Sequence, residues 1–167
     1  MFIRVSFTPN THFVASISRL VNDFCRITLR DTEISVRFQI AAHELAENIA
    51  KYSTGPDVSV DIELLDKEGK HALRLRTRNR TSPERLVEVE KRVTALMAAQ
   101  DPAAFYDRLI EESIAHKGVS GLGLARIRAE SGFDFDYSIQ GDELTLVVSG
   151  PVPKPPQMAA STDSPPV

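Results

Sequence analysis

Apolar residues follow two different periods in the first third of this chain. Residues 1–8 place four large apolar side chains in a β-rich run that ends at Pro9, which predicts a strand followed by a turn. Over residues 13–24 apolar side chains recur every three or four positions, which predicts an amphipathic helix. The same period returns over residues 32–52 and stops before Gly55-Pro56, so a second helix is expected there.

The rest of the chain predicts two hairpins separated by further helices. The expected strands are Val58–Leu64, Ala72–Thr77, Phe133–Ile139 and Glu143–Val148, and the expected helices are 83–97, 105–114 and Leu122–Ala129. Ser82 and Pro83 form a helix start, and Asp101-Pro102 separates the next two helices. Two hairpins require a sheet that is at least partly antiparallel. We therefore predict an α/β (α+β) two-layer sandwich, with a mixed, mostly antiparallel sheet and helices on one face.

Composition sets the boundaries of this domain. The chain has 167 residues, which fits one domain over residues 1–149. Six of the last eighteen residues are proline, so residues 150–167 are expected to be a disordered tail. A net charge of −3 without a basic run disfavours nucleic acid as a partner. One cysteine and no long apolar segment predict a cytoplasmic protein without a membrane partner.

Polar residues interrupt the apolar pattern of the second helix. Glu44, Asn48 and Lys51 stand at i, i+4 and i+7, so they project from one side. A carboxylate, an amide oxygen and an ammonium can together hold Mg²⁺ and phosphate oxygens. The same spacing also fits an ordinary solvated helix edge, so spacing does not decide between these interpretations.

A glycine-containing loop leads directly into the short helix at Leu122. Its sequence is Gly118-Val119-Ser120-Gly121-Leu122-Gly123-Leu124. Glycines allow phosphate to approach the backbone, and the N–H groups of a helix start attract anions. The loop matches neither the dinucleotide fingerprint nor the P-loop spacing. Taken alone, it is equally compatible with a structural turn.

Together these two segments resemble the GHKL superfamily, which has the Bergerat fold of histidine kinases, gyrase B, Hsp90 and anti-sigma factor serine kinases. Residues 44–53 (ELAENIAKYS) are similar to the N box, and residues 120–124 (SGLGL) are similar to the G2 box. The opening strand and the first helix most resemble the stand-alone anti-sigma kinase branch. Residues 78–84 and the helices up to Lys117 resemble small bacterial SiaB-type protein kinases.

This resemblance implies ATP and Mg²⁺ as cofactors and a small regulatory protein as partner. That partner would be similar to an anti-sigma antagonist or another phospho-acceptor, and a homodimer is left open. Glu44 would be the general base, and Asn48 would ligate Mg²⁺. The other nucleotide-binding residues would be Lys51, Tyr52, Asn79, Gly118, Gly121, Leu122, Gly123 and Leu124. Such parts suit phosphoryl transfer, which depends on positioning and charge neutralisation.

One motif of the family is absent. The G1 box, Asp-x-Gly-x-Gly, should follow the strand that ends at Thr77, but the chain continues Arg78-Asn79-Arg80. Asn79 has the hydrogen-bonding groups to contact adenine in place of the aspartate. Alternatively, Arg78 and Arg80 fill a pocket that no longer binds ATP. The kinase interpretation thus requires the glycine loop to lie near Asn48 around a hollow that arginines do not fill.

Two classes of function therefore remain. The first is an ATP-binding signalling protein, as a serine/threonine kinase or an anti-sigma-type regulator. The second is a non-catalytic module that keeps the fold and sequesters a protein partner without using ATP. By the resemblance, the helical stretch 83–117 stands where the wider family has a mobile ATP lid. It either extends the core, forms a docking groove or gates the site. The dispersed histidines disfavour a metal-dependent hydrolase of another type.

Overall fold

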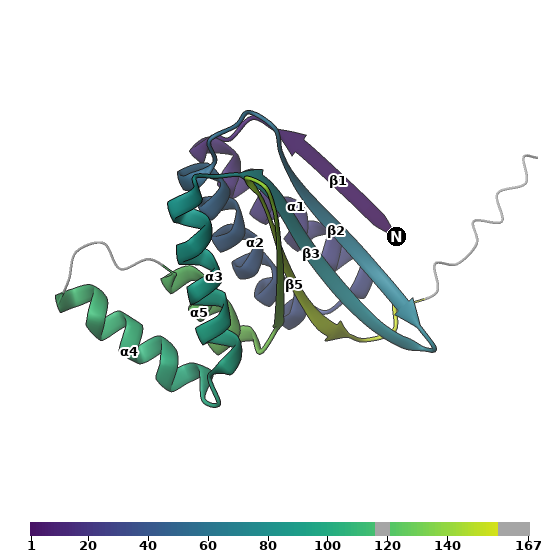
Figure 1. The fold of residues 1–167 in the computed structure, drawn as a ribbon. Helices are drawn as coiled ribbons and strands as arrows, with labels where there is room; N and C mark the ends of the chain where they lie inside the picture. Colours follow the sequence, from purple (N-terminus) through teal and green to yellow (C-terminus); the bar gives the residue numbers. More distant parts are fainter. Residues whose placement is uncertain (116–120, 157–167) are drawn as a thin grey trace, which may run out of the picture.

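The computed structural model describes residues 1–115 and 121–156. Its elements, in chain order, are β1 (Phe2–Phe7), the 3₁₀ turn η1 (Thr11–Phe13), α1 (Val14–Leu29), α2 (Thr32–Tyr52), β2 (Val58–Lys67), β3 (Lys70–Arg80), α3 (Pro83–Ala98), α4 (Pro102–Ala115), α5 (Leu122–Ser131), β4 (Asp134–Gln140) and β5 (Glu143–Val152). Figure 1 shows the helices gathered on one side of a single twisted sheet. The predicted two-layer α/β class is confirmed.

The five strands lie in the order β1-β2-β3-β5-β4, and every neighbouring pair is antiparallel. The sequence predicted a mixed sheet, but the described strands contain no parallel pair. The connections explain this, because two helices between β1 and β2 reverse the chain direction. The three helices after β3 return the chain so that β4 runs in the same direction as β3. The β4–β5 hairpin then reverses the chain, and β5 lies between β3 and β4, antiparallel to both.

The strands extend further than the pattern predicted. Glu68 and Gly69 both have positive φ, so a two-residue turn joins β2 directly to β3. At the same end of the sheet, β5 continues to Val152, which pairs with His71, beyond the predicted start of the tail. Gly150 permits this, because a Cβ at that position would collide with the ring of Phe133. Residues 157–167 of the predicted tail lie outside the described residues.

The core lies between the helices and the inner face of the sheet. Val21 of α1, Phe38 of α2, Ile62 of β2 and Leu75 of β3 are fully buried in it. The ring of Phe38 stacks on that of Phe133, with centroids 4.2 Å apart. Alternate residues of β2 and β3 therefore form one wall of the core, and α1 and α2 form the other.

Helices α3 and α5 lie beside the candidate residues, and α4 packs against α5. Ser82 caps α3 by accepting a hydrogen bond from the Arg85 amide, and the apolar face of α3 (Leu86, Val89, Val93, Leu96) is buried. This part of the stretch 83–117 extends the core. α4 reaches away from the body in Figure 1, and Leu109 is its one buried residue. No helix in the described parts of the chain is long and apolar enough to span a membrane.

Candidate functional site

The C-terminal half of α2 is anchored beside the end of β3. The hydroxyl of Thr81 donates a hydrogen bond of 2.7 Å to the carbonyl of Tyr52, and the Thr54 amide donates to the carbonyl of Arg80. These bonds hold the last turns of α2 next to the inner face of β3. Asn48 and Tyr52 of the helix thus face Asn79 of the strand across a shared cavity.

This cavity, called here the Asn48 cavity, is lined by residues from distant parts of the sequence. Helix α2 contributes Leu45, Asn48, Ile49 and Tyr52, and α3 contributes Arg85, Val89 and Arg92. The others are Thr77 and Asn79 of β3, Thr81 between β3 and α3, Gly121 and Leu124 at the start of α5, and Leu144 and Leu146 of β5. Five of the predicted nucleotide-binding residues therefore come together. The glycine loop lies near Asn48, which is the first condition of the kinase interpretation.

Asn79 forms part of the floor of the Asn48 cavity. It is 6% exposed, and its side-chain nitrogen donates a hydrogen bond of 3.2 Å to the backbone carbonyl of Arg80. This bond leaves the amide oxygen Oδ1 without a hydrogen-bond partner among the described residues. An amide oxygen that lines a cavity and has no protein partner is a natural acceptor for a ligand N–H.

Two arginines of α3 close the Asn48 cavity. The guanidinium of Arg85 lies 3.4 Å from the centroid of the Tyr52 ring, a cation–π contact, and pairs with Glu88 at 2.6 Å. The side chain of Arg92 lies against Gly121, whose φ of 90° and close neighbour both favour glycine. The remaining volume is ≈ 20 Å³, which holds about one water molecule. The second condition, a hollow free of arginines, is not met in this conformation.

The arginines that fill the hollow are not those that the sequence suggested. Arg78 and Arg80 are on β3, where side chains alternate between the two faces of the sheet. Asn79 faces the cavity, so its two neighbours face the opposite side of the sheet, and this alternative was wrong in its residues. Arg85 and Arg92 were missed. A detectable signal exists, because both flank the apolar stripe of α3, on the side of Val89.

Glu44 lies next to the Asn48 cavity without lining it. Its carboxylate oxygen Oε1 is 3.2 Å from Nη1 of Arg126 on α5, and the side chain is 14% exposed. Gly123 packs against this carboxylate, and a Cβ at Gly123 would collide with it. Glu44 borders a separate hollow of ≈ 290 Å³, together with Ser18, Gln39, Ile40, His43 and Arg126. Gly123 thus contacts the predicted base instead of the Asn48 cavity.

The remaining predicted residues lie outside the Asn48 cavity. Lys51 is half exposed, and its ammonium is 2.7 Å from the carboxylate of Glu47, whose pKa it lowers by hydrogen bonding. Leu122 packs against the apolar core. Gly118 lies outside the described residues. Only part of the predicted polar stripe of α2 therefore reaches the cavity.

The metal expectation is compatible with these side chains. Among the described residues, no group of three His, Cys, Asp or Glu side chains could hold a metal ion by itself. Mg²⁺ in nucleotide sites usually keeps several waters and takes one or two protein ligands plus phosphates. Asn48 would supply such a single ligand, so Mg²⁺ fits this donor set only together with a nucleotide.

Comparison with known proteins identifies the fold. No family model matches this sequence, and no curated protein matches it. A chain in the crystal structure of the SiaB–SiaC complex from Pseudomonas aeruginosa has a similar structure, with a TM-score of 0.64 and 13% sequence identity. The match covers 90% of this chain and 89% of that chain. The chain therefore shares its fold, over nearly its whole length, with a component of that complex.

Proposed function

We propose that this chain is an ATP-binding GHKL-fold signalling protein that acts on a small partner protein, as a serine/threonine kinase or an anti-sigma-type regulator. One observation carries the proposal. Asn48 and Tyr52 of the N-box-like helix, Asn79 at the G1 position and Gly121 of the G2-like loop meet around one cavity. These residues are separated by up to 73 positions in sequence, so their convergence is a property of the fold and supports a common ligand.

Each of these groups suits a different part of a nucleotide. The free amide oxygen of Asn79 would accept from the amino group of adenine, which is the role of a carboxylate in the family. Asn48 would hold Mg²⁺, which neutralises phosphate charge when bound. The backbone N–H groups at the start of α5, beside Gly121, would accept the phosphates. Glu44, next to Gly123, would be the base that orients the attacking hydroxyl.

Binding requires the side chains of α3 to move. The Asn48 cavity has no room for a base while Arg85 lies on Tyr52. Long arginine side chains can leave such a position by rotation. Arg85 and Arg92 both belong to the stretch 83–117, which stands where the family has a mobile lid. We attribute the small volume to this closed arrangement of α3.

A protein partner is supported by the fold. The similar solved structure is a complex of two proteins, SiaB and SiaC. Our chain resembles the SiaB-type kinases in sequence motifs and shares a fold with a component of that complex. A small regulatory protein is thus the partner class that we propose.

A second function is favoured by the two arginines themselves. Arg85 and Arg92 supply partly buried positive charge where the family binds a nucleotide, and the G1 aspartate and glycines are absent. A module that has lost ATP would use such side chains to stabilise its closed cavity. It would still bind a protein partner without phosphoryl transfer.

Titration with Mg-ATP distinguishes the two functions. We expect calorimetry to show Mg-dependent binding to the wild type, and thermal unfolding to show stabilisation of about 2.7 kcal/mol at a hundredfold excess over Kd. Asn48→Ala should weaken binding at least tenfold, and the matched Asn22→Ala on α1 should leave it unchanged. A wild-type protein that shows neither heat nor stabilisation at millimolar Mg-ATP would overturn the proposal and favour the non-catalytic module.

A further inference from the structure

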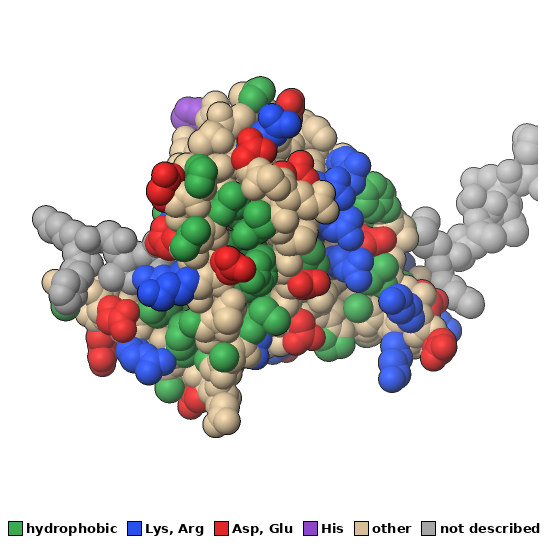
Figure 2. All heavy atoms as spheres, in the orientation of Figure 1, with side chains coloured by type: hydrophobic (Ala, Val, Ile, Leu, Met, Phe, Trp, Pro, Cys, Tyr) green, Lys and Arg blue, Asp and Glu red, His purple; other side chains and the backbone are tan. Residues whose placement is uncertain are grey.

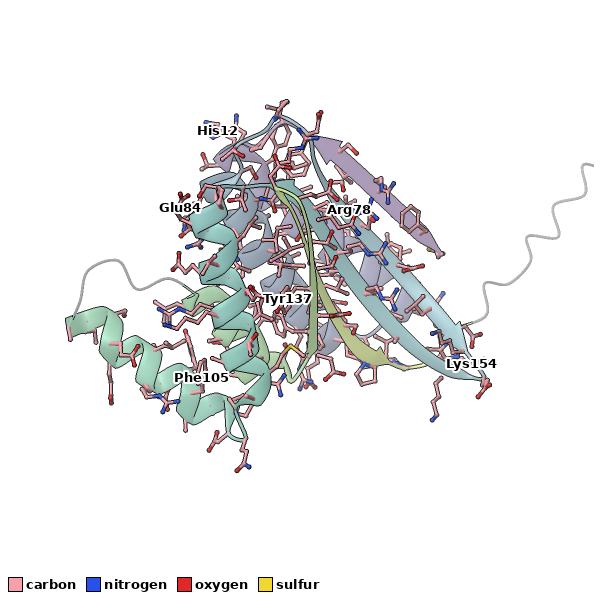
Figure 3. The ribbon with its side chains drawn as sticks, in the orientation of Figure 1. His12, Arg78, Glu84, Phe105, Tyr137 and Lys154 are labelled. Atoms are coloured by element: carbon pink, nitrogen blue, oxygen red, sulfur yellow. The ribbon has the colours of Figure 1, made fainter. Side chains whose placement is uncertain are left out.

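The face of the sheet turned away from the helices carries a row of arginines on β3. Arg74, Arg76, Arg78 and Arg80 alternate with residues that are buried on the other face of the strand. Figure 2 shows blue side chains in a column down the right of the molecule, and Figure 3 labels Arg78 there. Because like charges repel, each guanidinium in such a row is stabilised by an anion close to it.

Three of these arginines have a carboxylate from the protein itself. The ion pairs, with the distance between charged atoms, are Arg74–Glu63 at 3.3 Å, Arg76–Asp61 at 3.8 Å and Arg80–Asp142 at 3.8 Å. Strand register explains the first two pairs, because β2 places each carboxylate directly opposite its arginine. These three guanidinium groups therefore have their counter-charge within the fold.

Arg78 is the exception in this row. Its direct neighbours across the sheet are Ser59 of β2 and Thr145 of β5, neither of which carries charge. Asp61 attracts Arg78, but its carboxylate already accepts two hydrogen bonds from Arg4, at 2.7 and 2.9 Å. Among the described residues, the half-buried Arg78 side chain forms no ion pair and no hydrogen bond.

Arg78 lines a hollow of ≈ 490 Å³ beside the end of β1 and the start of β2, called here the Arg78 hollow. The hydroxyl groups of Ser6, Thr8 and Ser59 line it as well, and none of them has a hydrogen-bond partner in the described parts of the chain. Arg4 also borders it, held by its carboxylate partner. A guanidinium with several hydroxyl donors is suited to bind a carboxylate or another oxyanion.

Unpaired negative charge is present in the same hollow. Asp57, just before β2, and Glu143, the first residue of β5, both line it. Neither carboxylate forms an ion pair or a hydrogen bond with a described residue. Glu143 stands two residues before Thr145, so it is the diagonal neighbour of Arg78, and such neighbours lie about 7–8 Å apart. A cation and two carboxylates thus line one space without pairing with each other.

We propose that the Arg78 hollow binds a free α-amino acid with an apolar side chain. The carboxylate of the ligand pairs with Arg78 and the neighbouring hydroxyl groups, and its ammonium pairs with Glu143, near Asp57. An α-amino acid carries both charges on one carbon. With a hydrogen bond of about 2.8 Å at each end, it bridges protein groups about 8 Å apart. This span agrees with the diagonal spacing of Arg78 and Glu143.

The lining favours a zwitterion over an ion of one sign. A phosphate ion would be attracted by Arg78 and repelled by Asp57 and Glu143, and a simple cation would meet the reverse. Phe7 and Pro56 line the hollow too, and they supply apolar surface for the side chain of the ligand. The Asn48 cavity lies on the helix side of the sheet, so this inference does not depend on the proposed function.

Calorimetry of the full chain with L-leucine, L-valine and L-phenylalanine tests the proposal. We expect at least one of them to bind with a Kd of about 1 mM or lower. The amide of that amino acid lacks the carboxylate and its N-acetyl form lacks the ammonium, so each should bind at least tenfold more weakly. No binding of any of the three at about 10 mM would overturn the proposal.

Two variants assign the binding to the Arg78 hollow. Arg78→Ala should weaken binding of the amino acid at least tenfold and leave the affinity for its amide unchanged, because the amide has no carboxylate. Glu143→Gln should also weaken binding of the amino acid at least tenfold, but leave the affinity for its N-acetyl form unchanged. The matched controls are Arg19→Ala and Glu112→Gln, both exposed on helices, which should keep the wild-type affinity. Affinities that neither variant changes would overturn the proposal.

Inorganic phosphate separates a zwitterion site from a simple anion site. We expect phosphate to bind at least tenfold more weakly than the tightest of the three amino acids. Phosphate that binds as tightly as the amino acid, with binding lost in Arg78→Ala, would overturn the proposal. Should circular dichroism show that Arg78→Ala does not fold, Arg78→Gln, which keeps a long side chain without the charge, serves for the same comparison.

Discussion

The two faces of β3 differ in composition, because alternate residues of the strand are apolar or polar and buried on one face and arginine on the other. Toward the helices, Leu73 and Leu75 build the core, and Thr77 and Asn79 continue the same line into the Asn48 cavity. Toward the open side, Arg74, Arg76, Arg78 and Arg80 carry charge. Because side chains of a strand alternate, a single residue shift would exchange these surfaces. The core, the candidate site and the charged face therefore all depend on the register of this one strand.

The largest difference between the faces should appear in stability. Leu75 is fully buried, so Leu75→Ala should lower the free energy of unfolding by about 3 kcal/mol through lost burial and a residual cavity. The control on the opposite face is Arg78→Ala, which should change it by less than about 0.5 kcal/mol. Urea unfolding of both variants measures the contrast. Equal losses would show that the open face is packed in solution.

The next largest effect is expected on the open face, where the stabilising effect of the Arg4–Asp61 pair should depend on pH. Arg4 lowers the pKa of Asp61 below its ordinary value of 3.8, chiefly by hydrogen bonding. A depressed pKa stabilises the folded state above the unfolded value and loses that contribution as the pH falls through the folded value. At pH 7 we expect Asp61→Asn to cost about 1.5 kcal/mol, since Arg4 is partly solvent exposed.

The same variant should cost progressively less as the pH falls below 3.8. Urea titrations of wild type and Asp61→Asn at pH 7, 5 and 3 provide the measurement. Asp23→Asn, exposed on α1, is the matched control and should show no such trend. A difference that stays constant with pH would mean that the Arg4–Asp61 pair does not stabilise the fold.

The smallest effect concerns the closed side of the Asn48 cavity. If ATP binds there, Arg85→Ala should lower Kd about fivefold, because the variant no longer has to break the contact with Tyr52, worth about 1 kcal/mol. Lys91→Ala, an exposed change on α3, should leave Kd unchanged. Calorimetry with Mg-ATP measures both. A higher Kd for Arg85→Ala would instead show that this guanidinium contacts the bound nucleotide.

The pattern of apolar residues was sufficient to predict the helices and strands and their order along the chain. Apolar periodicity placed α1, α2 and both hairpins, because each buries one face against the same core. It underestimated strand ends, where Gly69 and Gly150 allow turns and close packing that hydrophobicity does not report. It also could not show that all neighbouring strands are antiparallel, since that depends on β5 lying between β3 and β4, which run in the same direction.

At the candidate site, the sequence motifs predicted several of the residues that line the cavity, but not the side chains that pack around them. Asn48, Tyr52, Asn79, Gly121 and Leu124 do share a cavity. Lys51 was expected there, yet it pairs with Glu47 outside the cavity, because its side chain is turned about 100° round the helix from that of Tyr52, which lines the cavity. Arg85 and Arg92 were not expected. Their place beside the apolar stripe of α3 shows that they border its buried face, but only the tertiary structure shows that this face covers the cavity.

The amino-acid sequence by itself determined the two-layer fold, the register that separates buried from charged residues, and the polar groups available for a ligand. These are local properties, set by side-chain periodicity and turn chemistry. Only the tertiary structure decided that Glu44 faces Arg126 and Gly123, that arginines of α3 fill the Asn48 cavity, and that basic and acidic residues share one hollow on the open face. Those facts depend on which distant segments meet, and packing of the whole chain is what brings them together.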